Sequence, residues 1–390
     1  MVYDFDRVID RTGTMAEKYD FIQREGYPAD VTPLWVADME FATAQPVLDA
    51  LHRRVDHGIF GYTETGEAYA QAVRGWWERH YQFTFETSWL VKTPTIVYSL
   101  ATAVRAFTQP GDPVLIQQPV YHPFKNVVVN NGRVPVSNDL VLRDGKYYMD
   151  FEGLEKTIQA HNIKLMLFCS PHNPVGRSWT PEELARLGEI CHRYGVIVVA
   201  DEIHCDFTWW GGQHTVLLNA APCLRDRCIL CISPSKTFNL AGLQVANNII
   251  PNPELRERFV QAKERPAFDE CNVLGIVACM AAYNEGEEWY QQLKSYLEGN
   301  LRLVEEFVAE KLPGVTMIHP EATYLLWLDF KGLGLPEEEV THKLLYEAKL
   351  WLNRGSMFGP TGAGFQRLNA ACPRSTLESA LERMRQTFCK

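Results

Sequence analysis

Residues 164–201 read KLMLFCSPHNPVGRSWTPEELARLGEICHRYGVIVVAD and give the clearest indication of the fold. Both ends are short apolar runs of strand length. Between them, Thr180 is the expected N-cap of a helix, Glu183 completes a capping box, and Gly195 follows the last periodic residue as a stop signal. A strand, a helix and a strand in this order predict a parallel pair within an α/β sheet.

The same alternation extends outward on both sides. Further apolar runs of strand length lie at residues 112–117, 133–136 and 228–232, with amphipathic segments between them. The expected fold is therefore α/β, with a mostly parallel central sheet flanked by helices. Ligands of such sheets bind beyond the carboxyl ends of the strands.

The pattern of apolar and polar residues changes twice along the chain, which predicts three regions. A long charged amphipathic helix from residue 287 to 311 precedes a shorter α+β pattern, so we expect a smaller C-terminal domain over residues 289–390. Residues 1–45 are irregular and contain no long periodic segment, as in an arm that packs on the smaller domain. Residues 46–288 would form the large domain.

Composition excludes several classes of function. The chain has 390 residues, 46% of them apolar, and a net charge of −10, without the run of basic residues that a nucleic-acid backbone would require. Its apolar stretches are far shorter than the roughly 20 residues of a membrane-spanning helix. The acidic start lacks the features of a secretory signal, so a cytoplasmic location is expected.

Ten cysteines raise the question of a metal or disulfide framework. Cys228 and Cys231 make a C-x-x-C pair, but they stand in a predicted buried strand, and no second pair follows at zinc spacing. We therefore expect reduced, buried thiols and no metal site.

Three polar loops follow predicted strands, at residues 170–176, 201–204 and 233–237, and should meet at one edge of the sheet. They bring together Lys236, Asp201 and Asn173. A lysine that forms an imine, a carboxylate that keeps a pyridine nitrogen protonated and an amide that binds a ring hydroxyl are what a pyridoxal cofactor requires. Taken singly, these residues are more often a surface charge, a cap and a turn former; their joint occurrence in order favours the cofactor site.

These motifs carry a family resemblance. The segments at residues 170–177, 201–204 and 233–244 together resemble the fold-type-I pyridoxal-phosphate enzymes of the class I/II aminotransferase superfamily. Within it, the chain resembles the cystathionine β-lyase-like (maltose-regulon-modulator-like) carbon-sulfur lyases. That narrower match rests on LWVADMEF at residues 34–41, VYHPF at 120–124, and GFQRLN followed by ACPR within 364–374.

The resemblance implies roles around the cofactor ring. Lys236 would carry pyridoxal 5'-phosphate as a Schiff base, Asp201 would pair with the pyridine nitrogen, and Asn173 would bind the ring hydroxyl. Tyr121 would stack on the ring. His204 stands where many relatives have a tyrosine, so it either touches the ring oxygen or is a packed core histidine.

The resemblance also implies a phosphate site. The backbone of Thr95, Ile96 and Val97 would bind the phosphate at the start of a helix, where free N–H groups and the dipole favour an anion. Ser233 and Ser235 would add hydroxyl donors.

Two more positions bear on the phosphate. Tyr62 matches a tyrosine that relatives lend to the phosphate of the neighbouring subunit, which implies a homodimer. Gln244 stands where many aminotransferases have an arginine, a departure that agrees with the lyase-like subgroup.

The resemblance places the substrate on Arg367, a bidentate clamp for the α-carboxylate, with Asn173 and Tyr121 beside it and Arg374 as a weaker candidate for the clamp. The implied reaction is β-elimination from cystathionine or another cysteine S-conjugate, giving a thiol, pyruvate and ammonia, with Lys236 as the base. The aromatic and apolar segments 35–41 and 351–359 would line the entrance and suggest tolerance of uncharged or hydrophobic sulfur substituents.

Two alternatives remain open from the sequence. The first is transamination with the same cofactor, which the motifs separate poorly from elimination. The second is a regulatory protein that holds the cofactor but acts by binding a transcription factor; no basic patch or docking tail favours it.

Overall fold

The computed structural model describes residues 1–267 and 270–389. Its centre is a seven-stranded sheet of order β2-β10-β9-β8-β7-β3-β4, in which only β10 runs against its neighbours, so the prediction of a mostly parallel sheet is confirmed. The strands are β2 (Leu90–Thr93), β3 (Pro113–Ile116), β4 (Val134–Ser137), β7 (Leu165–Cys169), β8 (Ile197–Asp201), β9 (Cys228–Ile232) and β10 (Ala246–Ile249).

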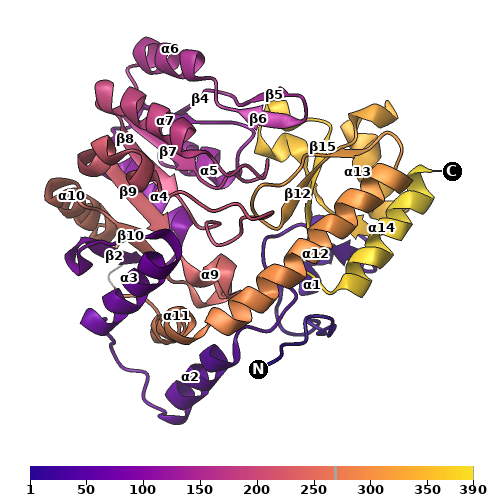
Figure 1. The fold of residues 1–390 in the computed structure, drawn as a ribbon, viewed down its shortest axis with the longest axis horizontal. Coiled ribbons are helices and arrows are strands. Elements are labelled where there is room, and N and C mark those ends of the chain that lie inside the picture. The colour runs from indigo at the N-terminus through magenta and orange to yellow at the C-terminus, as the bar shows by residue number, and fades with distance from the viewer. Residues whose placement is uncertain (268–269, 390) are drawn as a thin grey trace.

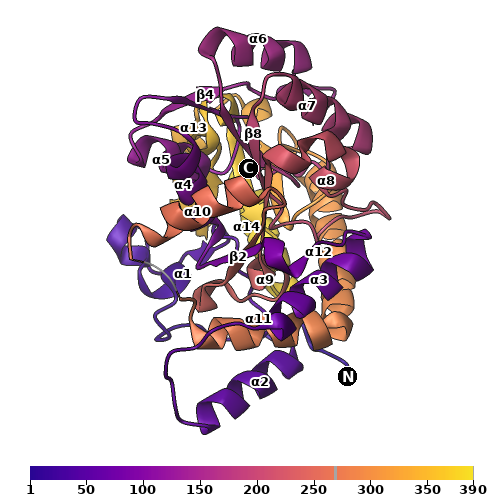
Figure 2. The ribbon, with the colours of Figure 1, turned by 90° about the vertical axis from the view of Figure 1, so that its left-hand side faces the viewer.

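Helices cover both faces of this sheet (Figures 1 and 2). One face carries α4 (Ile96–Phe107), α5 (Pro123–Asn130) and α10 (Pro253–Glu264); the other carries α3 (Glu67–Tyr81), α6 (Phe151–His161), α7 (Pro181–Arg193), the short α8 (Leu217–Ala220) and α11 (Val273–Glu285). Alternate strand residues enter different cores: in β7, Leu165 and Leu167 pack on the first face and Met166 and Phe168 on the second. Burial on both faces explains why the strands are apolar runs without alternation.

The helix α7 has the start that the sequence predicts. The Thr180 hydroxyl accepts a hydrogen bond from the Glu183 N–H at 3.2 Å, and the Glu183 carboxylate accepts one from the Thr180 N–H at 2.9 Å. This closed capping box orients the chain as it leaves the loop after β7.

A second sheet, of order β11-β12-β15-β14, is antiparallel. It consists of β11 (Thr316–Met317), β12 (Leu325–Asp329), β14 (Asn353–Arg354) and β15 (Phe365–Asn369), and it is accompanied by α12 (Glu287–Lys311), α13 (Glu337–Tyr346) and α14 (Arg374–Phe388). The long helix predicted for residues 287–311 is confirmed. The hairpin of β5 (Val141–Arg143) and β6 (Lys146–Tyr148) forms a separate two-stranded sheet.

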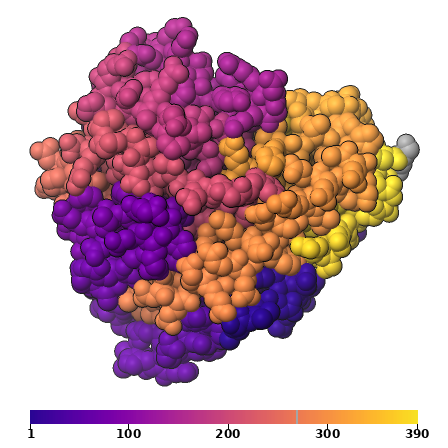
Figure 3. Space-filling view, viewed as in Figure 1, coloured from indigo at the N-terminus to yellow at the C-terminus, as the bar shows by residue number. Residues whose placement is uncertain are grey.

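The first residues of the chain lie against the C-terminal part. Tyr3 and Asp6 bind Gln292 and Tyr296 of α12, and Figure 3 shows the indigo N-terminal segment packed along the orange surface of that helix. After the short α1 (Glu17–Asp20), β1 (Thr32–Pro33) pairs in parallel with β13 (Leu350–Trp351). The boundaries near residues 45 and 288 stay predictions.

The helix α2 (Gln45–Asp56) lies at the lower edge of the molecule in Figures 1 and 2, where it packs on α11. No helix of the described residues is long and apolar enough to cross a membrane. All ten cysteines are free and eight are buried, including Cys228 and Cys231 in β9.

Candidate active site

A cavity of about 340 Å³ lies at the carboxyl edge of the large sheet. Nearly all of the site residues predicted from the sequence line this cavity. The predicted site residues that line it are Thr95, Ile96, Val97, Tyr121, Asn173, Asp201, His204, Ser233, Ser235, Lys236 and Arg367. Tyr62 and the weaker clamp candidate Arg374 do not line it.

The sheet topology explains this convergence. Because β7, β8 and β9 are parallel neighbours, their carboxyl ends meet at one edge. Asp201 is the last residue of β8, and Asn173 lies in the loop after β7. Lys236 lies in the short helix α9 (Pro234–Thr237) directly after β9, and the Ser233 hydroxyl caps that helix by accepting from the Ser235 N–H at 3.1 Å.

Burial favours the uncharged forms of the Asp201 carboxyl and the Lys236 amine. It raises the pKa of the Asp201 carboxyl to about 7, against the smaller lowering effects of the Ile203 N–H and the Lys236 charge. It lowers the pKa of the Lys236 amine to about 8, partly opposed by the nearby Asp38 and Asp201 carboxylates. A lysine with this pKa has a substantial unprotonated fraction near neutral pH, as a nucleophile or base requires.

Arg367 is a buried guanidinium bound by three protein oxygens. Its Nη1 donates to Asn173 Oδ1 at 2.9 Å, and its Nη2 donates to the Trp35 carbonyl at 2.8 Å and to Asn353 Oδ1 at 2.6 Å. Its buried Nε has no partner within the described residues, and burial lowers the pKa of the group to about 10. The side chain is thus held rigidly, as a carboxylate clamp requires.

Arg374 is not part of this cavity. It begins α14, where its Nε donates to Asn300 Oδ1 at 3.4 Å and its guanidinium lies over the Tyr296 ring, 5.2 Å from the centroid.

The start of α4 presents backbone donors to the cavity. Thr95 is the N-cap, and its hydroxyl accepts from the Tyr98 N–H at 3.1 Å. The N–H groups of the first helical turn have no partner within the helix, so Ile96 and Val97 offer donors to an anion.

The two serines differ in their availability. The Ser233 hydroxyl contacts the Val245 carbonyl at 2.7 Å and the Ser235 hydroxyl at 2.9 Å. Because Ser233 has one hydroxyl hydrogen, it is engaged within the protein, whereas the Ser235 hydroxyl can still donate.

His204 and Tyr121 form part of the wall. His204 is 3% exposed, its ring packs edge-on against Tyr324 with centroids 5.9 Å apart, and its Nδ1 has no partner among the described residues. Burial lowers the pKa of His204 well below its usual value, so the ring is neutral. Burial likewise raises the pKa of the Tyr121 phenol, which stays protonated.

Tyr62 lies elsewhere, on the connection between α2 and α3. Its side chain is 98% exposed, and the nearby Ile59 and Phe60 are 66% and 57% exposed. Within this single chain Tyr62 contributes nothing to the cavity.

Several residues of the site were assigned no role from the sequence. Asn353 and His122 line the cavity, and the backbone carbonyls of Trp35 and Ala37 bind Arg367 and Lys236. The sequence placed the segments 35–41 and 351–359 at the entrance, but an isolated asparagine and a backbone carbonyl give no signal that identifies them.

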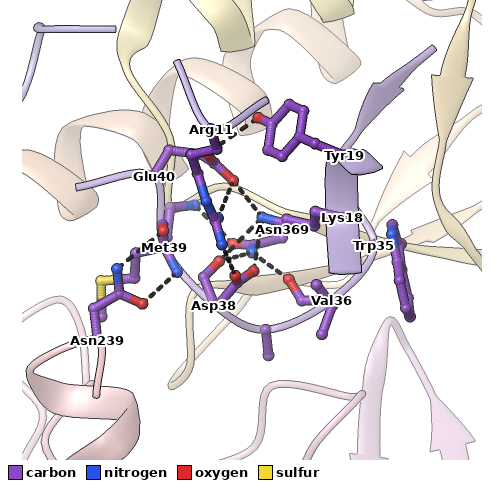
Figure 4. Close-up of polar contacts among 12 residues, drawn as sticks. Arg11, Lys18, Tyr19, Trp35, Val36, Asp38, Met39, Glu40, Asn239 and Asn369 are labelled. Atoms are coloured by element: carbon purple, nitrogen blue, oxygen red, sulfur yellow. Dashed lines mark hydrogen bonds and ion pairs between the residues drawn. The ribbon is translucent and has the colours of Figure 1, made fainter. Parts of the chain in front are cut away.

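The arm segment beside Lys236 is held by a buried cluster of charges (Figure 4). Lys18 donates to Glu40 Oε1 at 2.6 Å and lies 3.0 Å from Asp38 Oδ1, while Arg11 binds the same two carboxylates at 3.1 and 2.7 Å. We call Arg11, Lys18, Asp38 and Glu40 the arm cluster. Its two cations balance its two anions.

Two asparagines fix the backbone of the same segment. Asn369 donates to the carbonyls of Val36 and Asp38, both at 2.7 Å, and Asn239 exchanges hydrogen bonds of 3.0 Å with the backbone of Met39. The arm is therefore anchored both to β15 and to the segment after Lys236.

The parallel sheet with helices on both faces, the separate antiparallel sheet and the cavity at the strand ends define an aminotransferase-like α/β fold of type I. The family model described as "Aminotransferase class I and II" matches residues 29–384, and the chain belongs to this family.

Known proteins are similar to this chain along its full length. The cystathionine beta-lyase PatB of Bacillus subtilis is 40% identical over 382 residues, covering 98% of this chain and 99% of that protein. Protein MalY of Escherichia coli is 33% identical, covering 97% of each chain. The crystal structure of cystalysin from Treponema denticola, which contains a pyridoxal 5'-phosphate cofactor, superimposes with a TM-score of 0.96 at 36% identity and 99% coverage of both chains.

Proposed function

We propose that this protein is a pyridoxal-phosphate-dependent carbon-sulfur lyase that catalyses β-elimination from cystathionine or related cysteine S-conjugates. The observation that carries the proposal is that the half-buried amine of Lys236 meets the buried carboxylate of Asp201 and the buried guanidinium of Arg367 in one cavity. The similarity to cystathionine β-lyases and carbon-sulfur lyases along the whole chain favours elimination over the other reactions of the family.

The residues present fit the cofactor. The amine of Lys236 would hold its aldehyde carbon, and Asp201 would face its ring nitrogen. A carboxyl whose pKa is raised to about 7 by burial gains most from a neighbouring positive charge, and a protonated ring nitrogen supplies one. Asn173 would bind the ring hydroxyl and Tyr121 would cover the ring. His204 lies at the same wall, neutral and with an unpartnered Nδ1.

A phosphate fits the other end of the cavity. Ile96 and Val97 begin a helix of 12 residues, so their N–H groups and the helix dipole favour an anion. Ser235 adds a hydroxyl. Thr95 and Ser233 would act through the turns that they cap, since their hydroxyls already bind the protein.

Bound pyridoxal phosphate would supply the aldehyde that joins the substrate amino group and the ring that accepts electrons from the α-carbon. Arg367 would hold the α-carboxylate, with its free Nε available as a donor. The unprotonated Nζ of Lys236 would take the α-proton. The bond between the β-carbon and sulfur then breaks, sulfur leaves with the electron pair, and hydrolysis of the remaining fragment gives pyruvate and ammonia.

Tyr62 would act in the active site of a second copy of the chain. An exposed tyrosine beside exposed Ile59 and Phe60 is unusual for a free surface, and a homodimer in which Tyr62 binds the partner's phosphate would cover these side chains. A cytoplasmic location, expected from the sequence, completes the proposal.

Incubation with cystathionine and no keto-acid acceptor tests the reaction. Elimination gives continuous release of pyruvate and free thiol. A keto acid that stops after one turnover per site would mean transamination instead. Lys236→Ala should abolish both turnover and the visible absorbance of the lysine-linked cofactor, and survival of both would refute the assignment of Lys236.

A regulatory role is tested alongside the reaction. Capture of a transcription factor by a chain that turns over none of these substrates would favour it.

A further inference from the structure

A second cavity, of about 360 Å³, lies beside the active-site cavity, since Glu17 and Trp35 line both. All of its lining residues belong to the arm or to β13: Glu17, Phe21, Arg24, Glu25, Trp35 and Trp351. The proposed reaction uses the charges of Lys236, Asp201 and Arg367 in the first cavity. Glu17 is the charged lining residue that this reaction does not use.

Two opposite charges, those of Glu17 and Arg24, line the second cavity. Glu17 and Arg24 make no ion pair in the part of the chain that the structure describes, either with each other or with another side chain. The guanidinium of Arg24 is held over the Phe21 ring, 3.9 Å from its centroid. Glu25 adds a second carboxylate. A ligand with both an ammonium and a carboxylate group complements this arrangement better than an uncharged or anionic one.

An aromatic wall connects this cavity to the carboxylate clamp. The rings of Trp35 and Trp351 stack with centroids 4.4 Å apart and planes 18° apart, and Tyr27 meets Trp351 edge-on at 5.0 Å. The carbonyl of Trp35 accepts the hydrogen bond from Arg367. A substrate bound to Arg367 by its α-carboxylate therefore lies beside Trp35, whose ring offers an apolar surface for methylene groups leading into the second cavity.

We propose that the second cavity is a subsite for a sulfur substituent that itself carries an amino and a carboxylate group, with Glu17 binding the ammonium and Arg24 the carboxylate. The distal end of cystathionine belongs to this chemical class. This inference rests on the proposed function and replaces the expectation that aromatic segments at the entrance admit mainly uncharged or hydrophobic substituents.

A set of four substrates with matched chain lengths tests the subsite on the holoenzyme. Cystathionine carries both distal charges, S-(3-aminopropyl)cysteine the cation, S-(3-carboxypropyl)cysteine the anion, and S-propylcysteine neither. Pyruvate release gives kcat/KM for each. We expect cystathionine to be preferred over S-propylcysteine by about tenfold or more, and the preference to shrink as salt is raised, because exposed charges are screened.

Two variants separate the two contacts. Glu17→Gln should lower the ratio of kcat/KM for the aminopropyl over the propyl substrate by about threefold to tenfold, and Arg24→Gln should do so for the carboxypropyl over the propyl substrate. Glu310→Gln and Arg143→Gln, which remove the same charges from exposed positions elsewhere, should leave all four values within about twofold.

The two proposals fail in different ways. Pyruvate from all four substrates, with ratios that neither variant changes, would overturn the subsite and leave the lyase standing. No pyruvate from any substrate would overturn the lyase itself.

Discussion

The Nζ atom of Lys236 donates a hydrogen bond of 2.7 Å to the backbone carbonyl of Ala37, a residue 199 positions earlier in the chain. The same carbonyl accepts from the Tyr324 hydroxyl at 3.0 Å. The arm therefore forms one wall of the site and offers an acceptor to the lysine amine whenever the amine is free. Since the neighbouring carbonyl of Trp35 binds Arg367, one short segment contacts both the proposed base and the proposed clamp.

The ionisation of Asp201 should control the stability of the cofactor-free protein. Its pKa is about 7 in the folded chain and roughly 4 in an unfolded one, so the folded state binds more protons between these values and stability falls as pH rises through them. Above pH 7 the whole penalty is present. Asp201→Asn removes it and should stabilise the cofactor-free protein by about 2–4 kcal/mol at pH 8, but little at pH 4.

Urea titrations of both proteins at the two pH values measure this difference. An equal effect at pH 4 and pH 8 would contradict it. In the holoenzyme the same substitution should lower kcat by about a hundredfold or more, because the ring nitrogen loses its anionic partner.

Substitutions at Arg367 and at the control position Arg374 test which arginine binds the substrate carboxylate. Arg367→Lys keeps the charge but loses the planar fork, and kcat/KM for cystathionine should fall by about tenfold to a hundredfold. Arg374→Lys, outside the cavity, is the control and should change kcat/KM by less than about threefold. Steady-state kinetics on the two variants decide the point, and a larger loss at position 374 would reverse the assignment.

If Tyr62 completes the active site of the partner subunit, mixing two inactive variants should restore a defined fraction of the activity. Tyr62→Ala and Lys236→Ala should each be nearly inactive. When they are unfolded together and refolded as a mixture, half of the dimers are mixed, and each mixed dimer has one site with both residues intact. Activity should return to about one quarter of the wild-type value per subunit. If both variants are inactive and their mixture stays inactive, Tyr62 acts within its own chain; if Tyr62→Ala alone keeps its activity, Tyr62 has no role at the site.

The four charged residues of the arm cluster should contribute to the free energy of unfolding in a coupled way, so that their effects are not additive. Lys18 is 1% exposed and Glu40 is 6% exposed. Lys18→Met leaves the Glu40 charge uncompensated except by the partly exposed Arg11, and it should cost about 3–5 kcal/mol. The double variant Lys18→Met/Glu40→Gln should cost less than the single one. Denaturant titrations of both variants measure this coupling, and strict additivity would show that it is absent.

Much of the fold was predictable because its signals are local. The strands, the capping box at Thr180 and the helix that ends at Lys311 follow from hydrophobic runs and capping residues within short windows of sequence. The placement of Asn173, Asp201 and Lys236 at one edge follows from the same source, since each lies at or shortly after the carboxyl end of a strand in the parallel part of the sheet.

The sequence by itself therefore determined the type of sheet, the edge that holds the site and the residues that follow each strand. Only the packing of distant segments showed that Asn353 and the Ala37 carbonyl belong to the site and that Glu17 and Arg24 line the second cavity. It also placed Arg367 in the active-site cavity and Arg374 outside it, in line with the resemblance. The physical reason is that hydrophobic periodicity and capping act between residues a few positions apart. Contacts between the arm, the large sheet and the smaller sheet arise only when distant segments pack, and their residues carry no local pattern that records the partner.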